Sequence, residues 1–231
     1  MLRKRGKTLK SKKETLMGLL LALAAIAVVL ITEQLIKPGY FIKSAVKLAC
    51  FGGAIIIYSV ITGKKITSVI FLRRLKDARP LILSVLFCFF GMAAAFLIFR
   101  SQLDLVNIRD NLMAKENLTR ENCLYVFAYI IIVNSFLEES FFRGFISHLL
   151  ENRRLGFLLS ALLFALYHIG IVSGWFNPLI FLICIGGLAL VGLFLQWLAE
   201  HFGSIAGSWI AHGSANVAIN IIGALLIFGI L

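Results

Sequence analysis

Charged residues are scarce in this chain. Only 15% of its 231 residues are Asp, Glu, Lys or Arg, whereas 60% are hydrophobic. A soluble domain carries about 25% charged residues and less than half apolar ones. The scarcity excludes an ordinary soluble domain, because so much apolar surface needs a non-aqueous surrounding. We therefore predict an integral membrane protein with an all-α fold, a polytopic bundle of transmembrane helices.

Cysteine is also scarce and is not arranged for bridges or metal ions. The four cysteines lie in apolar stretches, and no two of them form a Cys-x-x-Cys pair: Cys50, Cys88, Cys123 and Cys184. Such isolated cysteines are typical of small hydrophobic packing residues rather than of disulfides or metal ligands. The sequence also has no internal repeat and no low-complexity tract.

Acidic residues are few relative to basic ones, with 11 against 23 and a net charge of +12. The basic residues do not form an aromatic-interleaved patch on a soluble module, so nucleic acid is not an expected partner. They stand between long apolar runs, where positive charge reports membrane orientation. Seven of the first thirteen residues are basic, and we expect them to contact anionic lipid headgroups.

Long uncharged windows predict the membrane spans. We expect seven spans, or eight if the last run is broken, within residues 15–32, 48–63, 81–99, 122–150, 155–199 and 202–231. The run 155–199 is too long for one span, and the polar stretch from Ser173 to Pro178 divides it in two. Lys47 is expected to snorkel from the outer end of the second span.

Two polar segments separate the early spans. Residues 64–79 carry six basic residues and an apolar stripe at Ile66, Val69, Ile70 and Leu72, which predicts an amphipathic helix on the membrane surface. Residues 100–121 balance four basic against four acidic residues and are expected to form a solvated loop. We divide the chain into an N-terminal part, 1–120, with the basic tail, three spans and this amphipathic segment, and a core, 121–231.

Alternate loops differ strongly in Lys and Arg. The N-terminus has seven, the 64–79 loop six and the 151–154 turn two, whereas the loops between them are sparse or balanced. Because positive charge concentrates on the cytoplasmic side, we predict a cytoplasmic N-terminus and, with seven spans, an external C-terminus.

The fourth span contains a charged turn with Glu138, Glu139 and Arg143 between apolar residues. A charge deep in a span costs roughly 2.5–3.5 kcal/mol on insertion scales, so such residues are usually paired and functional. Glu139 and Arg143 are four residues apart on one helical face and can form an ion pair. Glu138 is then left over and is available as a general base.

Three further polar residues fall at a similar depth on later helices. Counted at 1.5 Å per helical residue from the cytoplasmic turns, Glu138 and His168 lie about 20 Å up. His212 lies about 14 Å up and Asn216 about 20 Å up. We therefore expect side chains from three helices to converge. His148 and His201 belong to no motif and are interpreted as surface residues.

The order Glu-Glu-x-x-x-Arg, Phe-x-x-x-His and His-x-x-x-Asn resembles the type II CAAX prenyl protease and bacteriocin-processing (CPBP, Abi) family of intramembrane proteases. Glu138, Glu139 and Arg143 match the first motif, Phe164 and His168 the second, and His212 and Asn216 the third. The resemblance covers about residues 121–216 and makes 121–231 the protease core. It implies a membrane-anchored peptide or protein substrate, which is lipidated in part of the family.

The predicted reaction is peptide-bond hydrolysis by an activated water. Glu138 takes the proton, His168 helps to hold the water, and His212 and Asn216 stabilise the oxyanion, while Glu139 and Arg143 orient the site. The resemblance implies the same roles.

Zinc is an open alternative, because Glu138, His168 and His212 could supply three ligands and leave one position for water. No compact motif such as His-Glu-x-x-His is present, and the order of the motifs does not separate the two mechanisms. We predict the metal-free one, with no cofactor. A non-catalytic immunity or scaffolding protein, or a small transporter, is the alternative function, because intramembrane Glu, Arg and His also mark proton relays.

Overall fold

The computed structural model describes residues 12–75 and 79–231. Most of the predicted lipid-contacting tail, residues 1–11, lies outside the described residues, and so do residues 76–78 of the predicted amphipathic segment.

Seven helices in the described part of the chain are long and apolar enough to cross a membrane, which confirms the all-α polytopic fold. The last run is one unbroken helix, so it contributes one span. The seven spans are Lys12–Ile36, Tyr40–Thr62, Arg79–Gln102, Cys123–His148, Arg153–Val172, Pro178–Phe202 and Ile205–Ile227.

Several spans combine α-helical turns with wider π-helical turns, and the third and fourth spans each end in a tighter 3-10 turn. The first joins α1 (Lys12–Ile31) to η1 (Thr32–Ile36), and the second joins α2 (Tyr40–Lys47), η2 (Leu48–Gly52) and α3 (Gly53–Thr62). The third is α5 (Arg79–Phe99) with η3 (Arg100–Gln102). The fourth is α7 (Cys123–Tyr129), η5 (Ile130–Asn134), α8 (Ser135–Glu139), η6 (Ser140–Phe145) and η7 (Ile146–His148). The last three are α9 (Arg153–Val172), α10 (Pro178–Phe202) and α11 (Ile205–Ile227).

Local sequence signals explain where the last three spans begin. The Asn152 side chain accepts hydrogen bonds from two backbone N–H groups at the start of α9. The Asn177 side chain accepts one such bond, from the Ile180 N–H at the start of α10, which has Pro178 at its first position, and the Ser204 side chain caps α11. These residues satisfy N–H groups that a helix start leaves free. The predicted break of the 155–199 run is thereby confirmed.

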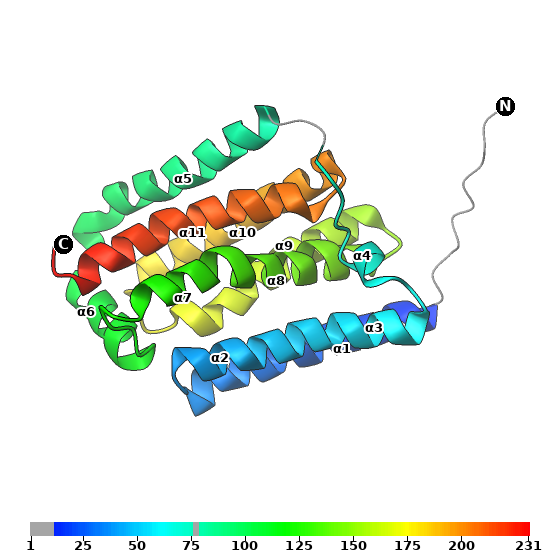
Figure 1. The fold of residues 1–231 in the computed structure, drawn as a ribbon, viewed down its shortest axis with the longest axis horizontal. Coiled ribbons are helices and arrows are strands. Elements are labelled where there is room, and N and C mark those ends of the chain that lie inside the picture. The colour runs from blue at the N-terminus through cyan, green and yellow to red at the C-terminus, as the bar shows by residue number, and fades with distance from the viewer. Residues whose placement is uncertain (1–11, 76–78) are drawn as a thin grey trace.

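The spans form a layered bundle (Figure 1). Helix α5 lies along one edge beside α11, and α1 and α3 lie along the opposite edge. The fourth span, α9 and α10 fill the space between them. The described chain starts at one end of the bundle and finishes at the other, as an odd number of spans requires. The charged turn of the fourth span therefore lies in the interior.

The segment after the second span is not the predicted amphipathic surface helix. Within the described residues 64–75, helix is confined to α4 (Ile66–Val69), and Val69 and Ile70 are buried in the protein core. A Cβ atom at Gly144 would come within 2.5 Å of the Ile70 carbonyl oxygen, so the glycine permits this close approach. Val69 and Ile70 of the apolar stripe therefore pack in the core cluster with residues of the fourth span, whereas Ile66 is exposed.

Residues 100–121 are also more ordered than the predicted solvated loop. They contain α6 (Leu105–Asp110) and η4 (Asn111–Lys115), and the Asp104 side chain accepts a hydrogen bond from the Asn107 backbone N–H. Leu118 is buried in a cluster with residues of α7 and α11. Leu118, with Leu112 packed against the same cluster, therefore holds this segment against α7 and α11.

Candidate active site

The fourth span carries the charged turn into the core. Glu138 and Glu139 end α8, and Arg143 lies in the π-helical turn η6. Arg143 Nη1 lies 3.3 Å from Glu139 Oε1, and both side chains are 0% exposed. The pairing predicted from the four-residue spacing is confirmed, and it places an ion pair out of reach of solvent.

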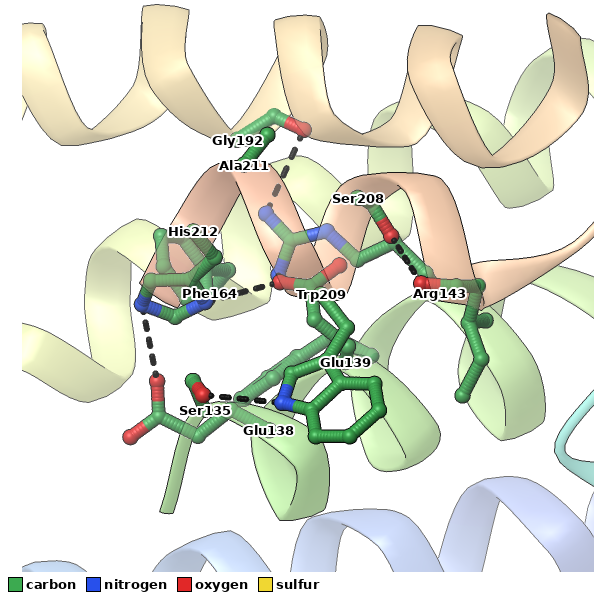
Figure 2. Close-up of polar contacts among 12 residues, drawn as sticks. Ser135, Glu138, Glu139, Arg143, Phe164, Gly192, Ser208, Trp209, Ala211 and His212 are labelled. Carbon is green, nitrogen blue, oxygen red and sulfur yellow. Dashed lines mark hydrogen bonds and ion pairs between the residues drawn. The ribbon is translucent and has the colours of Figure 1, made fainter. Parts of the chain in front are cut away.

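Arg143 is further fixed by the helices on either side. Its Nη2 donates to the Gly192 carbonyl oxygen of α10 at 3.4 Å (Figure 2). Its guanidinium carbon lies 4.0 Å from the centre of the Phe164 ring of α9, within the range of a cation–π contact. Phe164, the aromatic residue of the second motif, therefore supports the Glu139–Arg143 pair.

His212 of α11 lies between the two carboxylates (Figure 2). Its Nδ1 is 2.9 Å from Glu139 Oε1, and its Nε2 is 3.8 Å from Glu138 Oε2. Since an ionised carboxylate only accepts hydrogen bonds, Nδ1 carries the proton toward Glu139. The first and third motifs are thereby brought into direct contact across 73 residues of sequence.

Glu138 is not the left-over carboxylate that the sequence predicted. Its Oε1 accepts hydrogen bonds from Lys47 Nζ at 3.3 Å, Asn134 Nδ2 at 3.0 Å and the Tyr167 hydroxyl at 3.3 Å. Oε2 makes none of these bonds and faces His212. The carboxylate is only 2% exposed, so it needs such partners. Oε1 therefore holds the carboxylate in place, and Oε2 remains available to react.

His168 lies one residue beyond Tyr167 on α9. Its Nδ1 is 2.7 Å from the Phe164 carbonyl oxygen, and its ring packs against Phe164 and Tyr167. A carbonyl only accepts, so Nδ1 carries the proton and Nε2 remains an acceptor. The Phe164 ring lies 4.4 Å from the His168 ring and 5.7 Å from the His212 ring, between centroids. His168 and His212 therefore pack against the same aromatic ring.

Asn216 lies one turn beyond His212 but is directed elsewhere. Its Nδ2 donates to the Ile130 carbonyl oxygen at 3.3 Å, eight residues before Glu138 in the fourth span. The depth count had placed Asn216, rather than His212, level with Glu138, and it was wrong because helices begin at different heights and tilt. One of the two amide N–H groups of Asn216 remains for another acceptor.

The site does not fit the zinc ligand set. Within residues 12–75 and 79–231, no three His, Cys, Asp or Glu side chains are grouped as a metal ion would require. The Lys47 ammonium, 3.3 Å from Glu138 Oε1, is also a poor neighbour for a cation. We therefore derive no step through a metal ion.

Sequence reasoning missed three residues that contact Glu138. Lys47 was placed at the outer end of its span, yet the span begins at Tyr40 and the side chain is buried. A charge inside an apolar helix is usually paired. This rule was applied to Glu138, and applied to Lys47 it would have indicated a buried partner. Asn134 stands four residues before Glu138, on the same helical face, and Tyr167 directly precedes His168. His148 and His201 are exposed, as predicted.

A family model, type II CAAX prenyl endopeptidase Rce1-like, matches residues 120–218. This range contains all three motifs and most of the convergent site, but not Lys47. Comparisons with curated proteins and with solved structures found no match. Together with the seven apolar helices, this match supports an integral multi-pass membrane protein. Residues 120–218 therefore match the family that the three motifs predicted, the Rce1-like type II CAAX prenyl endopeptidases.

Proposed function

We propose that the protein is an intramembrane endopeptidase that hydrolyses a peptide bond by a metal-free, glutamate-activated water. The observation that carries this proposal is the arrangement of Glu138, with Oε1 anchored by three donors and Oε2 turned toward His212 at 3.8 Å. A gap longer than a direct hydrogen bond between two polar atoms suits a bridging water.

In the proposed reaction, Glu138 Oε2 removes a proton from that water while the water oxygen bonds to the substrate carbonyl carbon. The acceptor nitrogen Nε2 of His168 holds the second water hydrogen. The carbonyl oxygen becomes an oxyanion. When the intermediate collapses, the C–N bond breaks and the proton held by Glu138 passes to the leaving amine.

His212 and Asn216 are the proposed donors to the oxyanion. His212 Nδ1 is engaged with Glu139, so Nε2 is its free nitrogen, and Nε2 donates only when both ring nitrogens carry protons. The charged ring then lies between the carboxylates of Glu139 and Glu138, and Arg143 holds Glu139 in place. This gives the buried ion pair an orienting role rather than a reacting one.

The proposed substrate is a membrane-borne peptide, either a lipidated protein near its C-terminus or a peptide precursor. The family description names a prenyl endopeptidase. The exposed apolar side chains along the spans make lipid the natural surroundings of the enzyme, so a substrate held in the same bilayer can reach it laterally.

Purified protein should cleave members of a library of membrane peptides, prenylated and unmodified. The cleavage should survive a chelator that strips three-ligand zinc sites, because no step uses a metal. Peptide mass spectrometry and elemental analysis of the same preparation provide the measurement. About one zinc per chain, with activity lost on chelation and restored by zinc, would overturn the metal-free mechanism. No cleavage of any peptide would favour a scaffolding role.

The N-terminus is proposed to be cytoplasmic, because the segment around α4, which carries Lys64, Lys65 and Arg73, lies at the bundle end where α1 begins (Figure 1), and Lys64 pairs with Glu14 in the first turn of α1. Single cysteines at Lys65 and Asp110, both exposed, test this in a chain whose four native cysteines are replaced. In intact cells, a membrane-impermeant thiol reagent should label position 110 and spare position 65. The reverse pattern would invert the orientation and the side of substrate entry.

A further inference from the structure

Lys47 is a charged residue inside the second span and outside the part of the chain that matches the family. Its side chain is nearly as buried as the catalytic candidates, at 8% relative exposure. Its Nζ donates to Asn134 Oδ1 at 2.8 Å and to Glu138 Oε1 at 3.3 Å. It also lies 5.1 Å from the centre of the Tyr167 ring, a cation–π distance. Every one of these contacts belongs to the surroundings of Glu138.

With both imidazole rings neutral, the charges of the site balance only when Lys47 is included. Arg143 is paired with Glu139 at 3.3 Å, which leaves the negative charge of Glu138 without a cation on its own helix. Lys47 brings the matching positive charge from α2. A buried charge without a partner is strongly destabilising, so Lys47 is the counter-ion that lets Glu138 stay ionised in the core.

The geometry gives Lys47 a second effect. Asn134 and Glu138 are four residues apart on one face of the fourth span, and the Lys47 ammonium contacts both side chains. Asn134 in turn donates to Glu138 Oε1 at 3.0 Å. The three groups form a closed triangle on one carboxylate oxygen, which fixes the rotation of the carboxylate and turns Oε2 toward His212.

We propose that Lys47 is a positioning residue that holds the Glu138 carboxylate by Oε1 and directs Oε2 to the water. This inference rests on the proposed function, because it assigns Glu138 as the base. It adds to the site a residue from the N-terminal part of the chain, so the catalytic arrangement is completed by a helix that the three motifs do not contain.

Lys43 provides a matched control. It lies one turn before Lys47 on α2 and is equally buried. Its Nζ pairs instead with Glu33 at 3.0 Å and Glu116 at 2.7 Å. Lys43→Met therefore removes a buried lysine and its ion pairs from the same helix and leaves the Glu138 triangle in place.

The pairing is tested by a double-mutant cycle on thermal stability in detergent. Lys47→Met should lower the apparent melting temperature in the wild-type background. The loss should nearly vanish when Glu138→Gln is also present, because the charge that Lys47 balances is then gone. The loss caused by Lys43→Met should be the same in both backgrounds. Equal losses from Lys47→Met in the two backgrounds would overturn the pairing.

Positioning is tested by kinetics on the folded fraction. Lys47→Met should lower kcat about 100-fold, as a small displacement of a reacting group can, and change KM less than about threefold. Lys43→Met should keep the wild-type kcat. An unchanged kcat in Lys47→Met would overturn the positioning role while the proposed function stood. A wild-type protein that cleaves nothing would contradict the proposed function, and the stability cycle would still decide the ion pair separately.

Discussion

Glu138→Gln is expected to abolish peptide cleavage, with a loss of at least about 10²–10⁴-fold in kcat. The amide keeps the shape of the side chain but cannot take a proton from water at Oε2. The fold should persist, because the buried Glu139–Arg143 pair is untouched. Turnover of a membrane peptide that wild type cuts, measured on equal amounts of folded protein, provides the test.

Glu200→Gln is the control for this substitution. Glu200 also belongs to a span but lies near the end of α10, where it pairs with the exposed Arg153 at 3.4 Å. Its variant should cleave at the wild-type rate. The double variant with Lys47→Met should fold as well as Glu138→Gln, because the charge that Lys47 balances is already absent, and it should remain inactive. Near-wild-type cleavage by Glu138→Gln would remove Glu138 from the reaction and the proposed mechanism with it.

Arg143→Met is expected to cost about 3–5 kcal/mol in the free energy of unfolding, because it leaves a buried carboxylate without its cation. Glu139 and Arg143 are both 0% exposed, so water cannot take the place of the lost partner. The contact of the guanidinium with Phe164 is lost as well. Thermal and denaturant unfolding in detergent measure the effect, and cleavage should fall with it because His212 loses its oriented neighbour.

Arg153→Met is the matched substitution at the surface. Arg153 pairs with Glu200, but its side chain is 77% exposed, and such exposed pairs contribute about 0–1 kcal/mol. The stability of this variant should therefore stay close to that of wild type. If Arg143→Met were equally harmless, the Glu139–Arg143 pair would have to be accessible to water, contrary to its burial in the core.

The sequence also predicted that side chains of three helices converge, but the individual contacts that it predicted correctly in the site are local to one helix. Glu139 and Arg143 are four residues apart, and so are Phe164 and His168, whose backbone and ring contacts are both present. The repeat of the helix brings such residues to one face whatever surrounds them. The contacts that sequence reasoning missed join different helices, as Lys47 and Glu138 do across 91 residues.

The sequence by itself determined the seven spans, since membrane insertion depends on the length and polarity of each segment alone. It also determined the break before Pro178 through local capping. Tertiary structure alone decided that the stripe at Val69 and Ile70 packs on the fourth span, because an apolar face is satisfied equally by lipid and by protein. It alone decided that Lys47 meets Glu138 and that His212, not Asn216, meets the carboxylates. Those contacts depend on the rotation, tilt and relative height of neighbouring helices, which no local spacing specifies.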